Sequence, residues 1–342
     1  MVHLFGREWT RSELLANIGD LSQIAGVRLG EWSDGVERGV RTAQVRTGSG
    51  LEFTILLDRG MDVGPAHYRG LPLAWISPAG FAHPAYFDRV GTGWFRTFGG
   101  GLLTGCGLTY LGSPGEDDGE ALGLHGLLSH LPAQHIRIGE DWKSDECVLW
   151  VEGEMRQARP FGENLRLRRR ISAELGGSRL MILDSAENLG SSTSPLMILY
   201  HINLGFPLLD TTCVLSSAPH PVRPRDDEAA AGLNEWMRFQ SPTPGYREQV
   251  FYHDLPGNAE GWASIRLTNP TRNLSIEVRH QKTTLPNLVE WKMMGQGAFV
   301  LGLEPANCLV EGRGRERSRG TLQFLAPGES RDFRVEIVVS EG

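Results

Sequence analysis

Short apolar runs that alternate with polar residues recur along most of the chain, and turn-forming residues separate them. Near the C-terminus, Phe333, Val335 and Ile337 alternate with charged side chains, and this period of two is typical of a strand with one buried face. The 43 glycines and 19 prolines suit many tight turns and few long helices. The sequence therefore predicts a mainly β protein, a sandwich of antiparallel sheets. Further strand-like runs lie at residues 40–58, 147–155, 165–175, 180–188, 265–278, 288–294 and 298–304.

A second alternating run lies just before the C-terminal one. It contains Leu322 and Phe324, and the turn-forming sequence Ala-Pro-Gly-Glu follows at residues 326–329. Two strand-like runs joined by a short turn are typical of a β-hairpin, so we expect these two runs to pair with each other.

The first residues of the chain predict a short helix. Thr10 and Glu13 have the spacing of a capping box, and Leu14 and Ile18 follow at near-helical spacing. We expect residues 1–25 to form an N-terminal helical extension that covers a sheet edge or contacts a partner. Residues 26–342 are expected to form a single β-sandwich domain, since β sandwiches often exceed the average domain length.

Charge and hydrophobicity argue against several classes of partner. The formal net charge is −7, whereas a nucleic-acid surface needs a basic patch that neutralises phosphates. We expect no membrane span, because no stretch of about 18 uninterrupted apolar residues occurs. The polar run at residues 225–228 is interpreted as a solvated loop rather than a metal site, and no metal is expected.

Cysteine usage and the start of the chain indicate a compartment. The four cysteines are scattered, without a Cys-x-x-Cys pair or a zinc-binding spacing. The first eight residues carry charges where a signal peptide needs an apolar run. We expect a reduced, cytoplasmic protein, and the sequence leaves open whether it forms a homo-oligomer.

Three side chains stand in contexts suited to proton transfer. His125 lies in a Gly-Leu-His-Gly segment after a glycine-dense stretch, where a backbone can approach a ligand closely. His201 closes an apolar, strand-like run and so lies at a strand end. Glu304 follows another apolar run, and burial there raises a carboxyl pKa toward the range of a general base.

In this order along the chain, these segments resemble motifs of the aldose 1-epimerase (mutarotase) family. More closely, the chain resembles a mutarotase-like branch of unknown function (DUF4432-type), through Asp-Arg-Gly-Met-Asp at residues 58–62, Gly-Gly-Leu-Leu-Thr at 100–104 and Leu-Glu-Pro-Ala-Asn at 303–307. The match covers most of the chain. It implies the galactose-mutarotase-like β supersandwich of antiparallel sheets.

The resemblance also implies roles for individual residues. Glu304 matches the catalytic base of the family, His201 its catalytic acid and His125 its other active-site histidine, while Arg59 matches a substrate-binding arginine. The implied reaction interconverts the α and β anomers of an aldose or sugar derivative by ring opening at the anomeric carbon, and it needs no cofactor. Departures from the galactose enzymes at residues 202–204 and at Ala306 leave the sugar open.

Other residues are candidates for binding a small-molecule carbohydrate. Pyranose C–H faces pack well on indole rings, which favours tryptophans near the three motifs. Amide and imidazole groups suit sugar hydroxyls. On these grounds the candidates are Trp291, Trp94, Asn203, Asn307 and His253, followed by Trp75, Glu248 and Asp254.

Two alternatives remain open from the sequence. The same fold can serve a non-catalytic carbohydrate-binding or regulatory protein. It also occurs in enzymes that cleave glycosidic bonds, but a glycoside hydrolase or lyase-like enzyme needs two catalytic carboxylates about 5–10 Å apart, and only Glu304 has a motif behind it. Whether the sugar is phosphorylated or oxidised also stays open.

Overall fold

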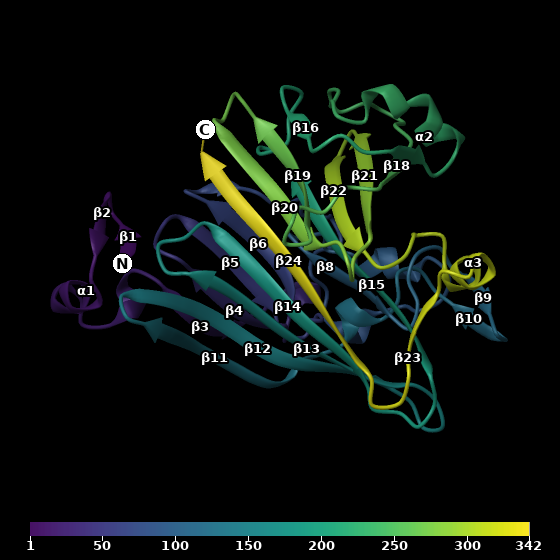
Figure 1. Cartoon of the computed structure of the whole chain (residues 1–342), viewed down its shortest axis with the longest axis horizontal. Coiled ribbons are helices and arrows are strands. Elements are labelled where there is room, and N and C mark those ends of the chain that lie inside the picture. Colours follow the sequence, from purple (N-terminus) through teal and green to yellow (C-terminus); the bar gives the residue numbers. More distant parts are fainter. Residues whose placement is uncertain (342) are drawn as a thin grey trace.

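The computed structural model describes residues 1–341 and is built mainly from antiparallel β-sheets (Figure 1). Its largest sheet has eight strands, and in Figure 1 several of them run side by side across the molecule. In spatial order these are β11 (Gln134–Lys143), β12 (Glu146–Ala158), β13 (Asn164–Glu174), β14 (Arg179–Asn188), β24 (Ser330–Glu341), β20 (Leu274–Gln281), β19 (Trp262–Asn269) and β16 (Val214–Ser216).

A second sheet, which we call the central sheet, lies in the middle of the fold. Its strand β15 pairs with three neighbours, namely β22, β8 and β23. The strands of this sheet, in order, are β17 (Val222–Pro224), β18 (Gln249–His253), β21 (Asn287–Gly295), β22 (Ala298–Ala306), β15 (Ser194–Gly205) and β23 (Gln323–Leu325), with β8 (Thr104–Leu108) off this path.

Within residues 1–341, the remaining strands and α-helices form a third sheet, two small hairpins and three short α-helices. The third sheet contains β3 (Gly26–Glu31), β4 (Arg41–Arg46), β5 (Leu51–Leu56), β6 (Asp62–Tyr68) and β7 (Leu71–Pro72). The hairpins are β1 (Val2–Leu4) with β2 (Arg7–Trp9) and β9 (Gly115–Asp117) with β10 (Glu120–Leu122), and the helices are α1 (Arg11–Asn17), α2 (Asp227–Ala231) and α3 (Arg313–Arg319).

The central sheet is buried on both faces, because its strand β15 contributes to two hydrophobic clusters. Ile198 and Ile202 belong to the main core, which also contains apolar side chains of the other two large sheets. Met197 and Leu199, on the opposite face, belong to a second cluster under the loops. His201 continues this second face, since side chains alternate along a strand.

The predicted C-terminal strand is confirmed as β24. Phe333, Val335 and Ile337 are buried, whereas Arg334 between them is exposed. The predicted hairpin with the preceding run is wrong. β23 pairs with β15 instead of β24, so the turn at residues 326–329 joins two different sheets.

The N-terminal helix is confirmed as α1. Thr10 caps it, and both hydrogen bonds of the predicted capping box with Glu13 are present. The hairpin β1–β2 precedes the helix and was not predicted. Val2 and Leu14 belong to the main core, so this segment is anchored to the rest of the fold by apolar contacts. Among residues 1–341, no helix is both long and apolar enough to cross a membrane.

Candidate active site

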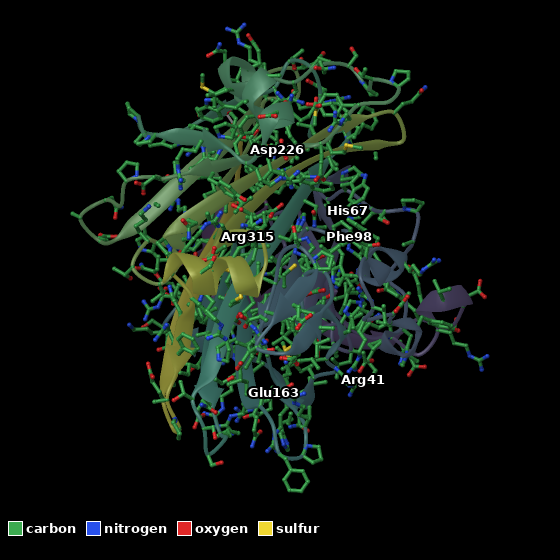
Figure 2. The ribbon with its side chains drawn as sticks, turned by 90° about the vertical axis from the view of Figure 1, so that its right-hand side faces the viewer. Arg41, His67, Phe98, Glu163, Asp226 and Arg315 are labelled. Atoms are coloured by element: carbon green, nitrogen blue, oxygen red, sulfur yellow. The ribbon has the colours of Figure 1, made fainter. Side chains whose placement is uncertain are left out.

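A pocket of about 250 Å³ lies over the second face of the central sheet. Strands β15, β18, β21 and β22 form its floor, and loops cover it. Phe98, which lines the pocket, and Asp226, which lies at its rim, are both labelled in Figure 2. The lining residues are Thr92, Trp94, Phe95, Phe98, Ser113, Pro114, Leu124, His125, His201, Arg225, Glu248, Val250, Val289, Trp291, Glu304 and Val310.

The register of two adjacent strands brings a carboxyl and an imidazole together. Leu199 pairs with Ala306 and Ile202 with Leu303, which sets His201 on β15 opposite Glu304 on β22. His201 Nε2 lies 3.3 Å from Glu304 Oε1, at ion-pair distance but not aligned for a hydrogen bond. Both side chains are buried, and both belong to rigid strands in the middle of a sheet.

His125 reaches the pocket from a loop. Its φ of 55° lies in the left-handed region, and its backbone is fixed on both sides: its N–H donates to Gly112 O and its carbonyl accepts from Gly107 N, each at 3.0 Å. Its ring centroid lies 6.0 Å from that of His201 and 4.7 Å from that of Trp94. The two histidines therefore share one pocket, although they lie 76 positions apart in the sequence.

Burial shifts the pKa values of Glu304, His125 and His201 in the direction that favours the uncharged form of each. Burial, with a further contribution from the charge of Glu248, raises the pKa of Glu304 well above its usual value. Burial lowers the pKa of His125 to about 4. Burial, aided by the neighbouring His125, lowers the pKa of His201 to about 3. At neutral pH both imidazoles are uncharged, so each can accept a proton through one ring nitrogen and donate through the other.

Several buried polar atoms of the pocket residues have no hydrogen-bond partner within residues 1–341. They are Nδ1 of His125, Nδ1 of His201, Nε1 of Trp94 and Oε1 of Glu304. Most buried polar groups in proteins are hydrogen-bonded, and each one that is not calls for an explanation. Four such atoms gathered around one pocket are consistent with a site built for a ligand rich in hydroxyl groups.

Aromatic rings form much of the pocket wall. Phe98 stacks on Trp94 at a centroid distance of 4.4 Å, and Trp291 meets the His201 ring edge-on at 5.3 Å. Trp291 Nε1 donates to Glu248 Oε2 at 2.8 Å, which fixes the orientation of the indole. Trp75 does not line the pocket, and instead contacts Trp291 edge-on at 6.2 Å.

Two of the other predicted sugar-binding residues are buried and do not line the pocket. The guanidinium of Arg59 donates to the carbonyls of Ala82 and Thr97, and only 1% of the residue is exposed. Asn203 Nδ2 donates to the carbonyls of Gly101 and His201 at 3.0 and 2.9 Å. Both side chains supply donors to buried backbone carbonyls, which need hydrogen-bond partners.

Asn307 and His253 also lie away from the pocket. Asn307 accepts from Ile198 N at 2.8 Å and donates to Leu196 O at 2.9 Å, and so links β15 to the end of β22. His253 lies on the opposite face of the central sheet, where its Nε2 is 2.9 Å from Glu290 Oε2. The structure thus brings together His125, His201, Glu304, Trp94 and Trp291, but not Arg59, Asn203, Asn307 or His253.

Arg225 is a pocket residue that the sequence analysis missed. It belongs to the polar run interpreted as a solvated loop, yet it lies at the pocket rim and contacts Glu248. Only the distant pairing of β17 with β18 places it there, and no local signal marks it. Among residues 1–341, no group of three or more His, Cys, Asp or Glu side chains is arranged to hold a metal ion.

Comparisons with known proteins agree with this architecture. Residues 37–339 match the family model described as "Domain of unknown function (DUF4432)". A search of curated proteins gives no significant match.

Solved structures share the fold at low sequence identity. A candidate aldose 1-epimerase from Klebsiella pneumoniae subsp. pneumoniae MGH 78578 superposes with a TM-score of 0.87 at 22% identity, over 92% of this chain and 83% of that one. A galactose mutarotase-like protein from Clostridium acetobutylicum gives 0.66 at 13% identity, over 94% and 100%. Galactose 1-epimerase from Lactobacillus acidophilus NCFM gives 0.59 at 12% identity, over 93% and 99%. The fold is therefore the predicted galactose-mutarotase-like one, and the chain belongs to the DUF4432 family.

Proposed function

We propose that the protein interconverts the anomers of an aldose or close sugar derivative by opening and reclosing its ring. The observation that carries this proposal is the buried pair of Glu304 and His201, 3.3 Å apart at the bottom of a pocket. The pocket volume of about 250 Å³ is enough to admit one monosaccharide ring.

The reaction requires one base and one acid. The base, Glu304 as carboxylate, removes the proton from the anomeric hydroxyl, while the acid, His201 as imidazolium, protonates the ring oxygen. The bond between the anomeric carbon and the ring oxygen breaks, and an open-chain aldehyde forms. Rotation about the adjacent C–C bond and closure on the other face return both protons and give the second anomer.

Burial of the pair supports this exchange of roles. Its effects on the pKa values favour neutral Glu304 and neutral His201 in the empty site, so the two groups share a single mobile proton. Moving that proton to His201 when the sugar binds creates the base and the acid together. The reverse reaction needs the opposite assignment, which the same pair provides.

The other pocket residues support sugar binding. Neutral His125 has an unpartnered Nδ1 that can bind a hydroxyl, and it lies close enough to His201 to act on the same ring. Trp291 and Phe98 present aromatic surface to the sugar C–H groups. No step of the reaction calls for a cofactor.

Saturation-transfer NMR on a panel of aldoses tests the proposal, with protein-free buffer as the reference for spontaneous exchange. We expect the wild type to accelerate exchange for at least one sugar, and Glu304→Gln and His201→Asn to abolish the acceleration while the fold is retained. Binding of a sugar by the wild type without any acceleration would contradict the proposal and favour a carbohydrate receptor.

Glu248 gives specific support to a second candidate function, glycoside hydrolysis, because it places another carboxyl at the same pocket. Both of its oxygens, however, already accept hydrogen bonds, from Arg225 and from Trp291. Release of nitrophenol from a panel of aryl glycosides measures this activity directly. We expect none, and release that depends on both Glu248 and Glu304 would establish the hydrolase instead.

A further inference from the structure

The charge at the pocket rim bears on which sugars the site accepts. Among the described residues that line the pocket, Arg225 is the one lysine or arginine. Its Nε donates to Asp226 Oδ2 at 2.8 Å, and its Nη2 donates to Glu248 Oε1 at 2.9 Å. Two carboxylates therefore already surround this single cation, and its charge is more than balanced.

Glu248 is held in place from a second side. Its other oxygen, Oε2, accepts from Trp291 Nε1 at 2.8 Å, so both oxygens are engaged by groups of the pocket wall. Its side chain is 44% exposed, which places the carboxylate at the mouth through which a ligand enters. An incoming anion that competes for Arg225 therefore meets a carboxylate that is also held by the indole of Trp291.

Asp226 is fixed as well. Its Oδ1 accepts from Ala229 N at 2.9 Å as the N-cap of α2, while its Oδ2 stays on Arg225. Because the helix start depends on this carboxylate, Asp226 is not free to leave the arginine. The cluster of Arg225, Asp226 and Glu248, which we call the rim cluster, is therefore a rigid unit with a formal charge of −1.

The interior of the pocket offers no compensating positive charge. The two histidines are neutral at physiological pH, since burial lowers the pKa of His125 to about 4 and that of His201 to about 3. Any ionisation of Glu304 adds negative charge. Proteins that bind phosphate or carboxylate groups present unpaired arginines, lysines or helix N-termini, and the described lining of this pocket presents none of these unpaired.

We propose that the rim cluster makes the site selective for uncharged sugars and against phosphorylated or carboxylated ones, with Glu248 as the specificity-determining residue. This inference rests on the proposed function, because it names the substrate class of the same pocket. The fixed negative charge of the rim cluster repels an anionic sugar as it approaches the entrance, while it is bound and in the transition state.

The test compares neutral and anionic aldoses in the same NMR exchange assay. Glucose and galactose are set against glucose 6-phosphate, glucuronate and galacturonate, and kcat/KM is measured for each. We expect the neutral sugars to be preferred by the wild type. Glu248→Gln removes one negative charge and should narrow that preference by about tenfold, for charges about 6 Å apart at an effective dielectric constant of about 40.

Two controls separate rim charge from other effects. Glu260→Gln makes the same change of net charge at an exposed position in a different depression, and it should leave the preference unchanged. Raising the salt concentration from about 0.05 to 1 M screens the repulsion, so the preference of the wild type should narrow without any mutation. This second measurement serves even if Glu248→Gln does not fold.

The outcomes distinguish failure of the proposed function from failure of the proposed selectivity. If the wild type accelerates exchange of no sugar, the proposed function fails. If it accelerates exchange but treats anionic sugars as well as or better than neutral ones, only the selectivity is refuted. If the preference for neutral sugars changes neither with the salt concentration nor in the Glu248→Gln variant, the role of the rim cluster is also refuted.

Discussion

Replacing Glu304 by glutamine should separate activity from stability. Glutamine keeps the shape of the side chain but cannot take up a proton, so loss of the proposed general base should lower kcat about 10²–10⁴-fold. The free energy of unfolding of the glutamine variant, in contrast, should rise relative to that of the wild type near neutral pH. Burial raises the pKa of Glu304 in the folded protein above its unfolded value near 4.5, so the wild type retains a proton on folding that the unfolded chain releases.

The sign of the pH effect follows from that difference. The contribution of Glu304 to stability is most favourable below the unfolded pKa, and it is lost as pH rises toward the folded pKa. Over this window the loss is about 1.4 kcal/mol per pH unit, and the glutamine variant does not share it. Relative to the wild type, Glu304→Gln should therefore become more stable from pH 5 to pH 8.

Urea denaturation at several pH values measures this, alongside the NMR exchange assay on the same samples. Glu316 provides a matched control, since it is equally buried, at 2% exposed, but accepts hydrogen bonds from Leu309 N and Thr321 Oγ1. Glu316→Gln should destabilise the protein at all pH values and leave the exchange rate little changed. If Glu304→Gln instead cost about 3–5 kcal/mol at every pH, Glu304 would be one half of a structural ion pair, and the reasoning above would be refuted.

Three further predictions follow from the geometry of the pocket. Gly302→Ala should impair activity and cost about 1–3 kcal/mol in a denaturation experiment, because the added Cβ would lie 2.4 Å from Glu304 Oε1. Burial lowers the pKa values of His125 and His201, so their contribution to stability is fully present above the unfolded pKa near 6.5 and is lost as the pH falls from there toward 3–4. Replacing either histidine by a non-titrating amide should flatten this pH dependence of stability, as measured by urea denaturation. Trp291→Phe removes the indole hydrogen bond and should raise KM for neutral sugars more than it lowers kcat, as steady-state exchange rates would show.

Local sequence patterns predicted those secondary-structure elements that depend on residues close together in the chain. The capping box of Thr10 and Glu13 predicted α1, and the alternation around Val335 predicted β24. The same reasoning failed for the run containing Phe324. Alternation identifies a strand but does not name its partner, and this run pairs with β15 rather than with β24.

The candidate site shows the same division. The motifs around His125, His201 and Glu304 could be recognised one by one, and the fold brings all three to one pocket. The positions of Arg225 and Asn203 relative to the pocket could not be predicted from the local sequence. Arg225 belongs to a polar run that was interpreted as solvated, but the distant carboxylate of Glu248 binds it at the pocket rim. Asn203 was a candidate for binding sugar hydroxyls, but its Nδ2 donates to two backbone carbonyls. Both outcomes depend on long-range contacts.

The position of the proposed acid/base pair on adjacent strands has an evolutionary consequence. Glu304 and His201 are fixed by the register of β15 and β22, whereas Arg225 and Phe98 reach the pocket from outside that pair of strands. Insertions and substitutions in the covering loops can therefore reshape the entrance without changing the distance between Glu304 and His201. A scaffold of this kind can acquire new substrates while its reaction stays the same.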